Sequence, residues 1–158
     1  MDLSSLKWLK NVKPHQGWAY CCINEMPIPE ARIFRLHWRS NTDKSIHVPQ
    51  KGDLMVLVQS AKATHIVELL DNVVYGNSEE EWSSYRIVKA IWMPPTGFDW
   101  SNLPHQKEAF GVDYLPPDGY VHNLSRTDQM FQFNQYWQPL GGLESFQNHL
   151  KKVLSSIS

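Results

Sequence analysis

The chain has 158 residues and a formal net charge of −1, with 15 Lys or Arg against 16 Asp or Glu. This length is typical of one domain that buries a normal core without disulfides or metals, so we expect a single domain over residues 1–158. The near-neutral charge argues against a strongly basic protein that binds nucleic acid non-specifically. The charge is uneven, however, because residues 1–52 carry eight Lys or Arg and four Asp or Glu, whereas residues 53–128 carry five and eleven. A basic first third favours a local positive face, although the fold can also intermix the two parts.

The first part of the chain is predicted to form a short helix, a strand and one ambiguous segment. Leu3, Leu6 and Leu9 favour a short opening helix, with a loosely held terminal arm as the alternative. The aromatic run 18–24 predicts the first strand, because such residues are typical of strands and prolines follow it. Residues 30–38 fit either a helix that begins after a proline or an extended segment.

Three successive strands are predicted in the middle of the chain. Residues 54–58 are apolar at every position, which is typical of a central strand covered on both faces. The next strand, within 64–71, places His65 and Glu68 on opposite faces because side chains alternate along a strand. A metal site at this His-x-x-Glu pair is therefore not expected, and the histidine should be hydrogen-bonded within or beside the sheet. The third strand is expected within 85–93.

The last part of the chain is predicted to contain a long loop and two helices. Residues 94–119 contain five prolines, so regular structure there should be short, and such a loop is either functional or simply wraps the barrel. Apolar residues at helical spacing over 143–157 predict an amphipathic C-terminal helix. A further helix is predicted to start near Thr127 and to carry three apolar residues on one face, namely Met130, Phe133 and Trp137.

The two cysteines, Cys21 and Cys22, are adjacent, so the sequence predicts no disulfide framework. We expect both to be small buried residues in a reducing compartment. The N-terminus has no charged segment followed by an apolar core, and no apolar run approaches membrane-spanning length. The sequence therefore predicts a cytoplasmic protein with no membrane partner.

No catalytic motif is present in the sequence. The eight glycines form no phosphate-binding loop, and the chain has no C-x-x-C or H-E-x-x-H pattern. The context of Cys21-Cys22 matches no nucleophile motif. The carboxylates of the 94–119 loop have no spacing that predicts an acid–base pair. We therefore expect no enzyme activity, no cofactor and no metal.

The strongest functional candidate is a cluster of aromatic and basic residues before the three predicted strands, namely Arg35, His37, Trp38, Arg39 and Asn41. Aromatic rings interleaved with arginines can stack a base, hold a phosphate and hydrogen-bond a base edge. Stacking contributes about 1–3 kcal/mol per base, which is comparable to the free energy lost when a base is extruded from a duplex. The alternative is that Trp38 belongs to the core and the arginines to the surface.

The order of these parts resembles the EVE domains of the PUA-like superfamily over about residues 18–93. The shared features are a first strand that opens on a tryptophan, a K-G-D turn before an apolar strand that ends near a serine, and two further strands. In this chain they are Trp18, Lys51-Gly52-Asp53, Ser60, 64–71 and 85–92. Two motifs of the family are replaced in this chain, and these replacements bear on whether the ligand of the family is bound more than on whether its fold is formed. The replacing segments are Thr64-His65-Ile66-Val67 and Asn24-Glu25-Met26-Pro27.

The resemblance implies an α+β fold, with a small, mixed, partly open β-barrel flanked by helices. EVE and related PUA-like domains hold a modified or flipped nucleobase, or an RNA nucleotide, in an aromatic pocket. Carried over by position, that pocket contains Trp38, Arg39, Asn41, Ser60, Trp18 and Asn24. The resemblance thus implies a non-enzymatic reader in a bacterial-type cytoplasm, whose partner is DNA or RNA. The alternative is a protein-interaction or immunity-type module on the same barrel, since the aromatic residues of 131–137 suit an interface.

Overall fold

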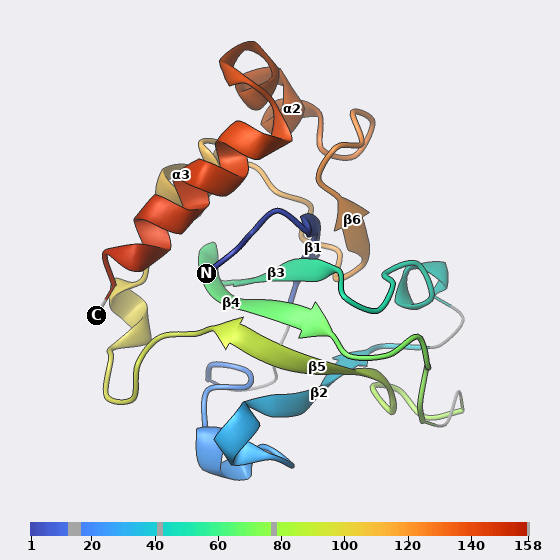
Figure 1. Ribbon diagram of the computed structural model, residues 1–158. Coiled ribbons are helices and arrows are strands. Elements are labelled where there is room, and N and C mark those ends of the chain that lie inside the picture. Colours follow the sequence, from blue (N-terminus) through green and yellow to red (C-terminus); the bar gives the residue numbers. More distant parts are fainter. Residues whose placement is uncertain (13–16, 41–42, 77–78, 158) are drawn as a thin grey trace.

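The computed structural model describes residues 1–12, 17–40, 43–76 and 79–157 (Figure 1). Its strands are β1 (Leu6–Asn11), β2 (Ile33–Trp38), β3 (Leu54–Gln59), β4 (Lys62–Leu69), β5 (Ser84–Trp92) and β6 (Val121–Asn123). Its α-helices are α1 (Gln106–Phe110), α2 (Phe131–Trp137) and α3 (Leu143–Ser155). Its 3-10 turns are η1 (Ile23–Glu25), η2 (Pro29–Ala31), η3 (Lys44–Ile46), η4 (Trp100–Asn102) and η5 (Gln138–Leu140).

The six strands form one mixed sheet in the order β2-β5-β4-β3-β1-β6. The predicted meander is confirmed, because β3, β4 and β5 pair antiparallel in succession. Strand β1 runs parallel to β3, and β6 closes the order antiparallel to β1. The sheet curls into a half-barrel whose free edges are β2 and β6 (Figure 1). The predicted α+β class with a partly open barrel is therefore confirmed.

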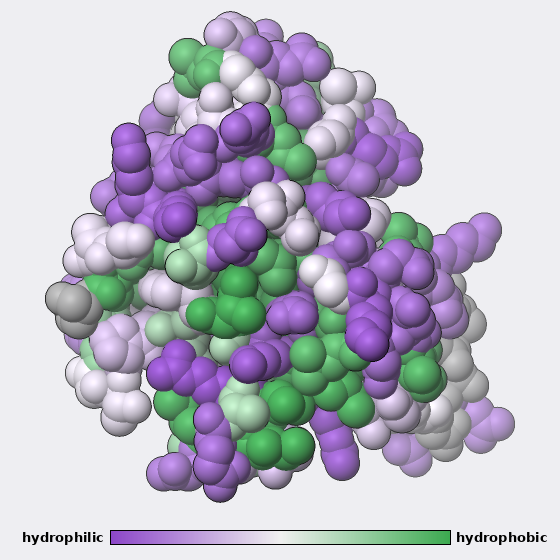
Figure 2. Space-filling view, in the orientation of Figure 1, coloured by the Kyte–Doolittle hydropathy of each residue, from purple (hydrophilic) through white to green (hydrophobic). Residues whose placement is uncertain are grey.

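Each face of the sheet buries its own hydrophobic core. Outside the half-barrel, Ile66 of β4 packs in one cluster with Phe110 of α1 and Phe146 of α3. Inside it, Met55 and Leu57 of β3 join a second cluster. Every residue of β3 is buried, as its apolar sequence predicts, because alternate side chains enter the two cores. The outer side of α3 is hydrophilic, and hydrophobic side chains gather below it over the sheet (Figure 2).

The predicted opening helix is wrong, because its residues form β1. The strand has a β-bulge between Leu6 and Trp8, where its register against β3 shifts. A bulge adds one residue to a strand, so Leu6 and Leu9 point into the same core although they lie three positions apart. Trp8 lies in the other core. The bulge thus gives this strand the spacing of an amphipathic helix.

The predicted strand 18–24 is also wrong, since the chain there is irregular and ends in η1. The backbone on both sides of Trp18 bonds to one side chain, with the Ala19 N–H donating to Gln59 Oε1 and Gln59 Nε2 donating to the Gly17 carbonyl, both at 2.8 Å. Tyr20 then takes a φ of 56°, which no strand residue adopts. Of the two options for 30–38, the extended one is realised by β2.

The predictions for the last part of the chain are largely confirmed. Residues 94–119 hold only η4 and α1 as helical structure, and α3 forms the C-terminal amphipathic helix. Helix α2 begins at Phe131 rather than near Thr127, and its expected apolar face is buried through Met130, Phe133 and Trp137. Among the described residues, no helix is both long and apolar enough to cross a membrane.

Candidate functional site

The residues predicted to line one nucleobase pocket do not converge. Trp38 is fully buried inside the half-barrel, with the Lys10 ammonium group 4.8 Å from the centre of its ring. Arg39 is exposed and pairs with Glu81 at 3.2 Å. The alternative left open by the sequence, a core tryptophan beside surface arginines, is therefore what the structure shows. Trp38 has no free ring face for a base, and it lies where β2 pairs with Ser84.

Three other predicted residues lie at the opposite end of the half-barrel. Ser60 is an exposed residue of the turn between β3 and β4, with a φ of 51°. Trp18 is held beside it through Gln59, and Trp18 and Asn24 line a common hollow of about 530 Å³. Asn41 lies outside the described residues. The predicted set is thus divided between two ends of the sheet.

Arg35 and His37 line a neighbouring hollow of about 330 Å³ together with Trp18, Tyr20 and Phe34. The Tyr20 hydroxyl accepts a hydrogen bond from the His37 N–H at 3.0 Å, so the loop covers part of the free edge of β2. Burial lowers the pKa of His37 and raises the pKa of Tyr20, because it disfavours the charged form of each group.

The prediction that both cysteines are buried is wrong. Cys21 is exposed and Cys22 is half-buried, and both line the two hollows beside Trp18. The reason is that residues 18–24 form a loop over the end of the barrel instead of a strand. A loop follows the surface, so its small side chains do not reach either core.

His65 is hydrogen-bonded beside the sheet, as predicted. Its Nε2 lies 3.1 Å from the carbonyl oxygen of Tyr20, and its Nδ1 lies 2.9 Å from Thr64 Oγ1. Burial lowers the pKa of His65 to about 4, and the bond to Tyr20 opposes this only in part. Glu68 is not among its partners. Within the described part of the chain, no group of three or more His, Cys, Asp or Glu side chains is placed to hold a metal ion.

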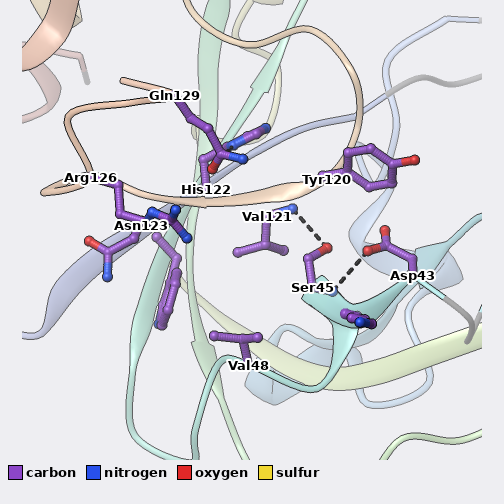
Figure 3. Close-up of a pocket in the computed structure, with 11 residues that line it drawn as sticks. Asp43, Ser45, Val48, Tyr120, Val121, His122, Asn123, Arg126 and Gln129 are labelled. Carbon is purple, nitrogen blue, oxygen red and sulfur yellow. Dashed lines mark hydrogen bonds between the residues drawn. The ribbon is translucent and has the colours of Figure 1, made fainter. Parts of the chain in front are cut away.

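The other free edge of the sheet borders a pocket that the sequence did not indicate (Figure 3). Its volume is about 510 Å³, and it lies between β6, the η3 segment and the turn after β6. The Val121 N–H donates to Ser45 Oγ at 3.0 Å, and Asp43 accepts from the Ser45 N–H at 2.8 Å. These bonds hold η3 against the edge of β6. The apolar part of the lining comes from Val48, Val121 and Trp8.

Trp8 is fixed in this pocket by an ion pair behind it. Its Nε1–H donates to Asp53 Oδ2 at 2.8 Å, and Lys7 lies 3.2 Å from Asp53 Oδ1. Burial acts to raise the pKa of Asp53, but its bonds to Trp8, to the Gln50 N–H and to Lys7 outweigh it and lower that pKa overall. The carboxylate therefore stays ionised at neutral pH and holds the indole in place.

A chain of polar groups fixes the inner wall of the pocket. His122 is buried, with Nε2 2.8 Å from Asp118 Oδ1 and Nδ1 3.0 Å from the side chain of Gln129. A carboxylate only accepts hydrogen bonds, so Nε2 carries a proton. One polar atom of the Gln129 side-chain amide is thereby bonded to His122, and its other polar atom is available to a molecule in the pocket.

The rim of the pocket carries cationic, amide and aromatic groups. Lys44 and Arg126 supply positive charge, and Arg126 is paired with Asp128 at 2.7 Å on the exposed surface. Asn123 Oδ1 accepts from the Ser125 N–H at 2.8 Å, which leaves its NH₂ group as a donor. Tyr120 is 52% exposed and lies on the side opposite Arg126 (Figure 3).

The backbone of β6 adds hydrogen-bonding groups to this pocket. The Leu124 N–H donates to the Lys7 carbonyl, so the even-numbered residues of β6 face β1. By the alternation of an antiparallel ladder, the N–H and C=O groups of Val121 and Asn123 face the pocket edge. The Val121 N–H donates to Ser45 and the Asn123 carbonyl accepts from the Arg126 N–H, so the groups that can meet a ligand are the Asn123 N–H and the Val121 carbonyl. A strand of three residues has no measurable sequence period, which is why no pattern indicated this site.

Three comparisons with known proteins were made, and no family model, no curated protein and no solved structure matches this chain.

Proposed function

We propose that this protein is a non-enzymatic reader of nucleic acid, which holds an unpaired or extruded nucleotide in the pocket beside β6. The observation that carries this proposal is the meeting of aromatic, amide and cationic side chains at a free sheet edge, through Tyr120, Asn123, Lys44 and Arg126. These are the three chemistries that bind a base face, a base edge and a phosphate.

Each part of a nucleotide has a partner of suitable chemistry in the pocket. The exposed ring of Tyr120 offers a stacking surface worth about 1–3 kcal/mol for a base. The NH₂ group of Asn123 and the fixed amide of Gln129 can bond to base edges. Lys44, which has no ion-pair partner among the described residues, can contact a phosphate.

The resemblance to EVE domains supports the same class of ligand by an independent route. Of the ordered series over about residues 18–93, the three strands after the K-G-D turn are formed and the first strand, 18–24, is not. We include a PUA-like fold identity in the proposal. The place of the ligand differs from the one carried over by position, because Trp38 is buried. DNA and RNA, with or without a modified base, are both within the proposal.

Fluorescence anisotropy with labelled single-stranded DNA and RNA at low salt tests the proposal. Tyr120→Ala should weaken binding roughly 5- to 100-fold, because stacking of one base is lost. Tyr114→Ala is the matched control, since Tyr114 is 51% exposed and lines none of the hollows described above. Lys44→Met should weaken binding more than Lys151→Met, although both remove one exposed positive charge.

Two outcomes would contradict the proposal. Absence of binding to any oligonucleotide at 50 mM salt, including oligonucleotides with methylated bases, would exclude a nucleic-acid ligand. Equal losses for Tyr120→Ala and Tyr114→Ala, or for Lys44→Met and Lys151→Met, would show that any binding is a general surface effect and not a property of this pocket.

A protein-interaction module is the second candidate, and a specific surface favours it. Helix α2 and η5 expose three large apolar residues, Phe131 at 61%, Tyr136 at 46% and Leu140 at 55%. Exposed aromatic residues are enriched at protein interfaces. A stable partner that co-purifies with the protein and is lost in Phe131→Ser, together with no affinity for nucleic acid, would select this candidate.

A further inference from the structure

The hollow beside Trp18 and Asn24 has a lining that differs in charge from the pocket at β6. It lies between the loop 17–28 and the segment 93–100, which are drawn in blue and yellow in the lower left part of Figure 1, and it shares no lining residue with the β6 pocket. Trp18, Phe98 and Trp100 form its aromatic part. Among the residues that the structure describes, no lysine, arginine or histidine lines it.

Two of its rings meet at an angle and form adjoining walls. The ring centres of Trp18 and Trp100 are 5.8 Å apart, with 49° between their planes. The faces of indole rings carry a partial negative charge from the π-electrons, and they attract cations within about 6 Å of the ring centre. In the described part of the chain, no basic side chain lies over either ring as a cation.

The aromatic walls are held in place before any ligand arrives. The buried Gln59 side chain bonds to the backbone on both sides of Trp18, at 2.8 Å each. Trp100 is 8% exposed and packs edge-on against His65, with ring centres 5.4 Å apart. A site whose walls are already ordered loses less conformational entropy when it binds a ligand.

Among the described lining residues, one carboxylate supplies the formal charge. Asp99 Oδ1 accepts from the Ser101 N–H at 3.0 Å and from the Ser101 hydroxyl at 2.7 Å, as the cap of η4. The hydrogen bonds from Ser101 lower the pKa of Asp99, with the side-chain bond as the largest cause, so the group is anionic at neutral pH. Asp99 lines the same hollow as Trp18 and Trp100, so this charge lies beside the aromatic walls.

We propose that this hollow binds a methylated ammonium group, against the walls formed by Trp18 and Trp100 and beside the carboxylate of Asp99. A bare ammonium group is strongly hydrated, and it would lose water on entering aromatic walls. Methyl groups replace that hydration with apolar surface while the positive charge remains. The same chemistry is found in free quaternary amines such as choline and in the side chain of trimethyl-lysine.

Titration of the protein with tetramethylammonium, followed through the two indole N–H signals of Trp18 and Trp100 in an NMR spectrum, tests this site. Both signals should shift, and tert-butanol, a neutral molecule of similar shape, should shift them at least about fivefold less strongly at equal concentration. Asp99→Asn keeps the cap of η4 and should weaken tetramethylammonium binding several-fold, whereas Asp113→Asn, which alters an exposed carboxylate elsewhere, should not.

Trp18→Phe and Trp18→Leu separate the ring from the fold. Phenylalanine should retain part of the affinity and leucine should lose about tenfold or more, while the thermal midpoint of each variant reports whether the loop still folds. Choline and trimethyl-lysine amide then identify the source of the group. Tighter binding of choline indicates a free amine, and tighter binding of trimethyl-lysine amide indicates a modified side chain. Equal shifts with tert-butanol, or unchanged affinity in Asp99→Asn, would overturn the proposal.

Discussion

Acidification should destabilise this protein through His65. The imidazole is fully buried, its ring packs between Phe34 and Trp100, and its two nitrogens bond to Tyr20 and Thr64. A carbonyl oxygen only accepts, so the neutral ring donates from Nε2 to the Tyr20 carbonyl and accepts at Nδ1 from the Thr64 hydroxyl. Protonation would place a positive charge in the core, and the Thr64 hydroxyl would have to turn its hydrogen to the Leu57 carbonyl, 3.4 Å away, in order to accept from Nδ1.

The size of the effect follows from the two pKa values. The pKa of His65 is about 4 in the folded protein against 6.5 for an ordinary histidine. Between these values the unfolded chain binds more protons than the folded one, so stability falls as the pH falls. The contribution is complete above pH 6.5 and is lost progressively toward pH 4. The full difference is about 3 kcal/mol, and about 2 kcal/mol of it is lost between pH 7.5 and pH 5.

Urea unfolding at pH 7.5 and pH 5, followed by tryptophan fluorescence, measures this loss. His65→Gln retains groups that can bond to Tyr20 and Thr64 but removes the titration, so its loss should be smaller by most of 2 kcal/mol. His47→Gln, at an exposed histidine, is the matched control and should behave as the parent protein. Burial also lowers the pKa of His37, which adds a loss of the same sign to every variant. If His65→Gln and the parent lost equal stability, the assignment to His65 would be refuted.

Three further predictions concern the core and the loops. Trp38→Phe should lower the free energy of unfolding by about 1–3 kcal/mol in a urea titration, because it leaves a cavity inside the half-barrel, and should leave the oligonucleotide affinity of the folded protein unchanged. Arg86 is buried and donates to three loop carbonyls at 2.7–2.9 Å, so Arg86→Met should destabilise the protein by roughly 3–6 kcal/mol, measured in the same way, and Arg86→Lys by less. An alkylating reagent should label Cys21 in the native protein faster than Cys22, as mass spectrometry can follow, since Cys21 is exposed and Cys22 is half-buried; equal rates would contradict this placement.

The candidate site could not have been predicted from the sequence, for a physical reason. The pocket at β6 joins η3 to β6 and to the turn after β6. Ser45 and Val121, which bond there, are 76 residues apart in the chain. Ser45 lies beside Val121 because of how the sheet is paired. Strand β1 pairs with both β3 and β6, and this places β6 at the free edge of the curled sheet, next to η3. No local pattern encodes such a meeting, since strand pairing depends on the complete sheet.

Local sequence patterns were sufficient for those elements whose spacing of apolar residues matches the faces that the element buries. The unbroken apolar run of β3 predicted a strand covered on both faces, and the helical spacing of apolar residues predicted the one buried face of α3. The two strands after β3 were predicted in the same local way. The alternation also placed His65 and Glu68 on different faces. The proline content of 94–119 limited its regular structure in the same local way.

Tertiary structure decided the rest by overriding local preference. A bulge gave β1 the spacing of a helix, and a side-chain bond to Gln59 held the strand-like run after Trp18 as a loop. Tertiary structure also decided the surroundings of Trp38 and Cys21. Trp38, a candidate for the ligand pocket, is buried in the core, and Cys21, which was expected to be buried, is exposed. The sequence by itself determined the meander and the terminal helix, because neighbouring residues suffice to specify them. Which side chains face a ligand depends on how the sheet curls and on where its free edges lie, and only the folded chain decides that.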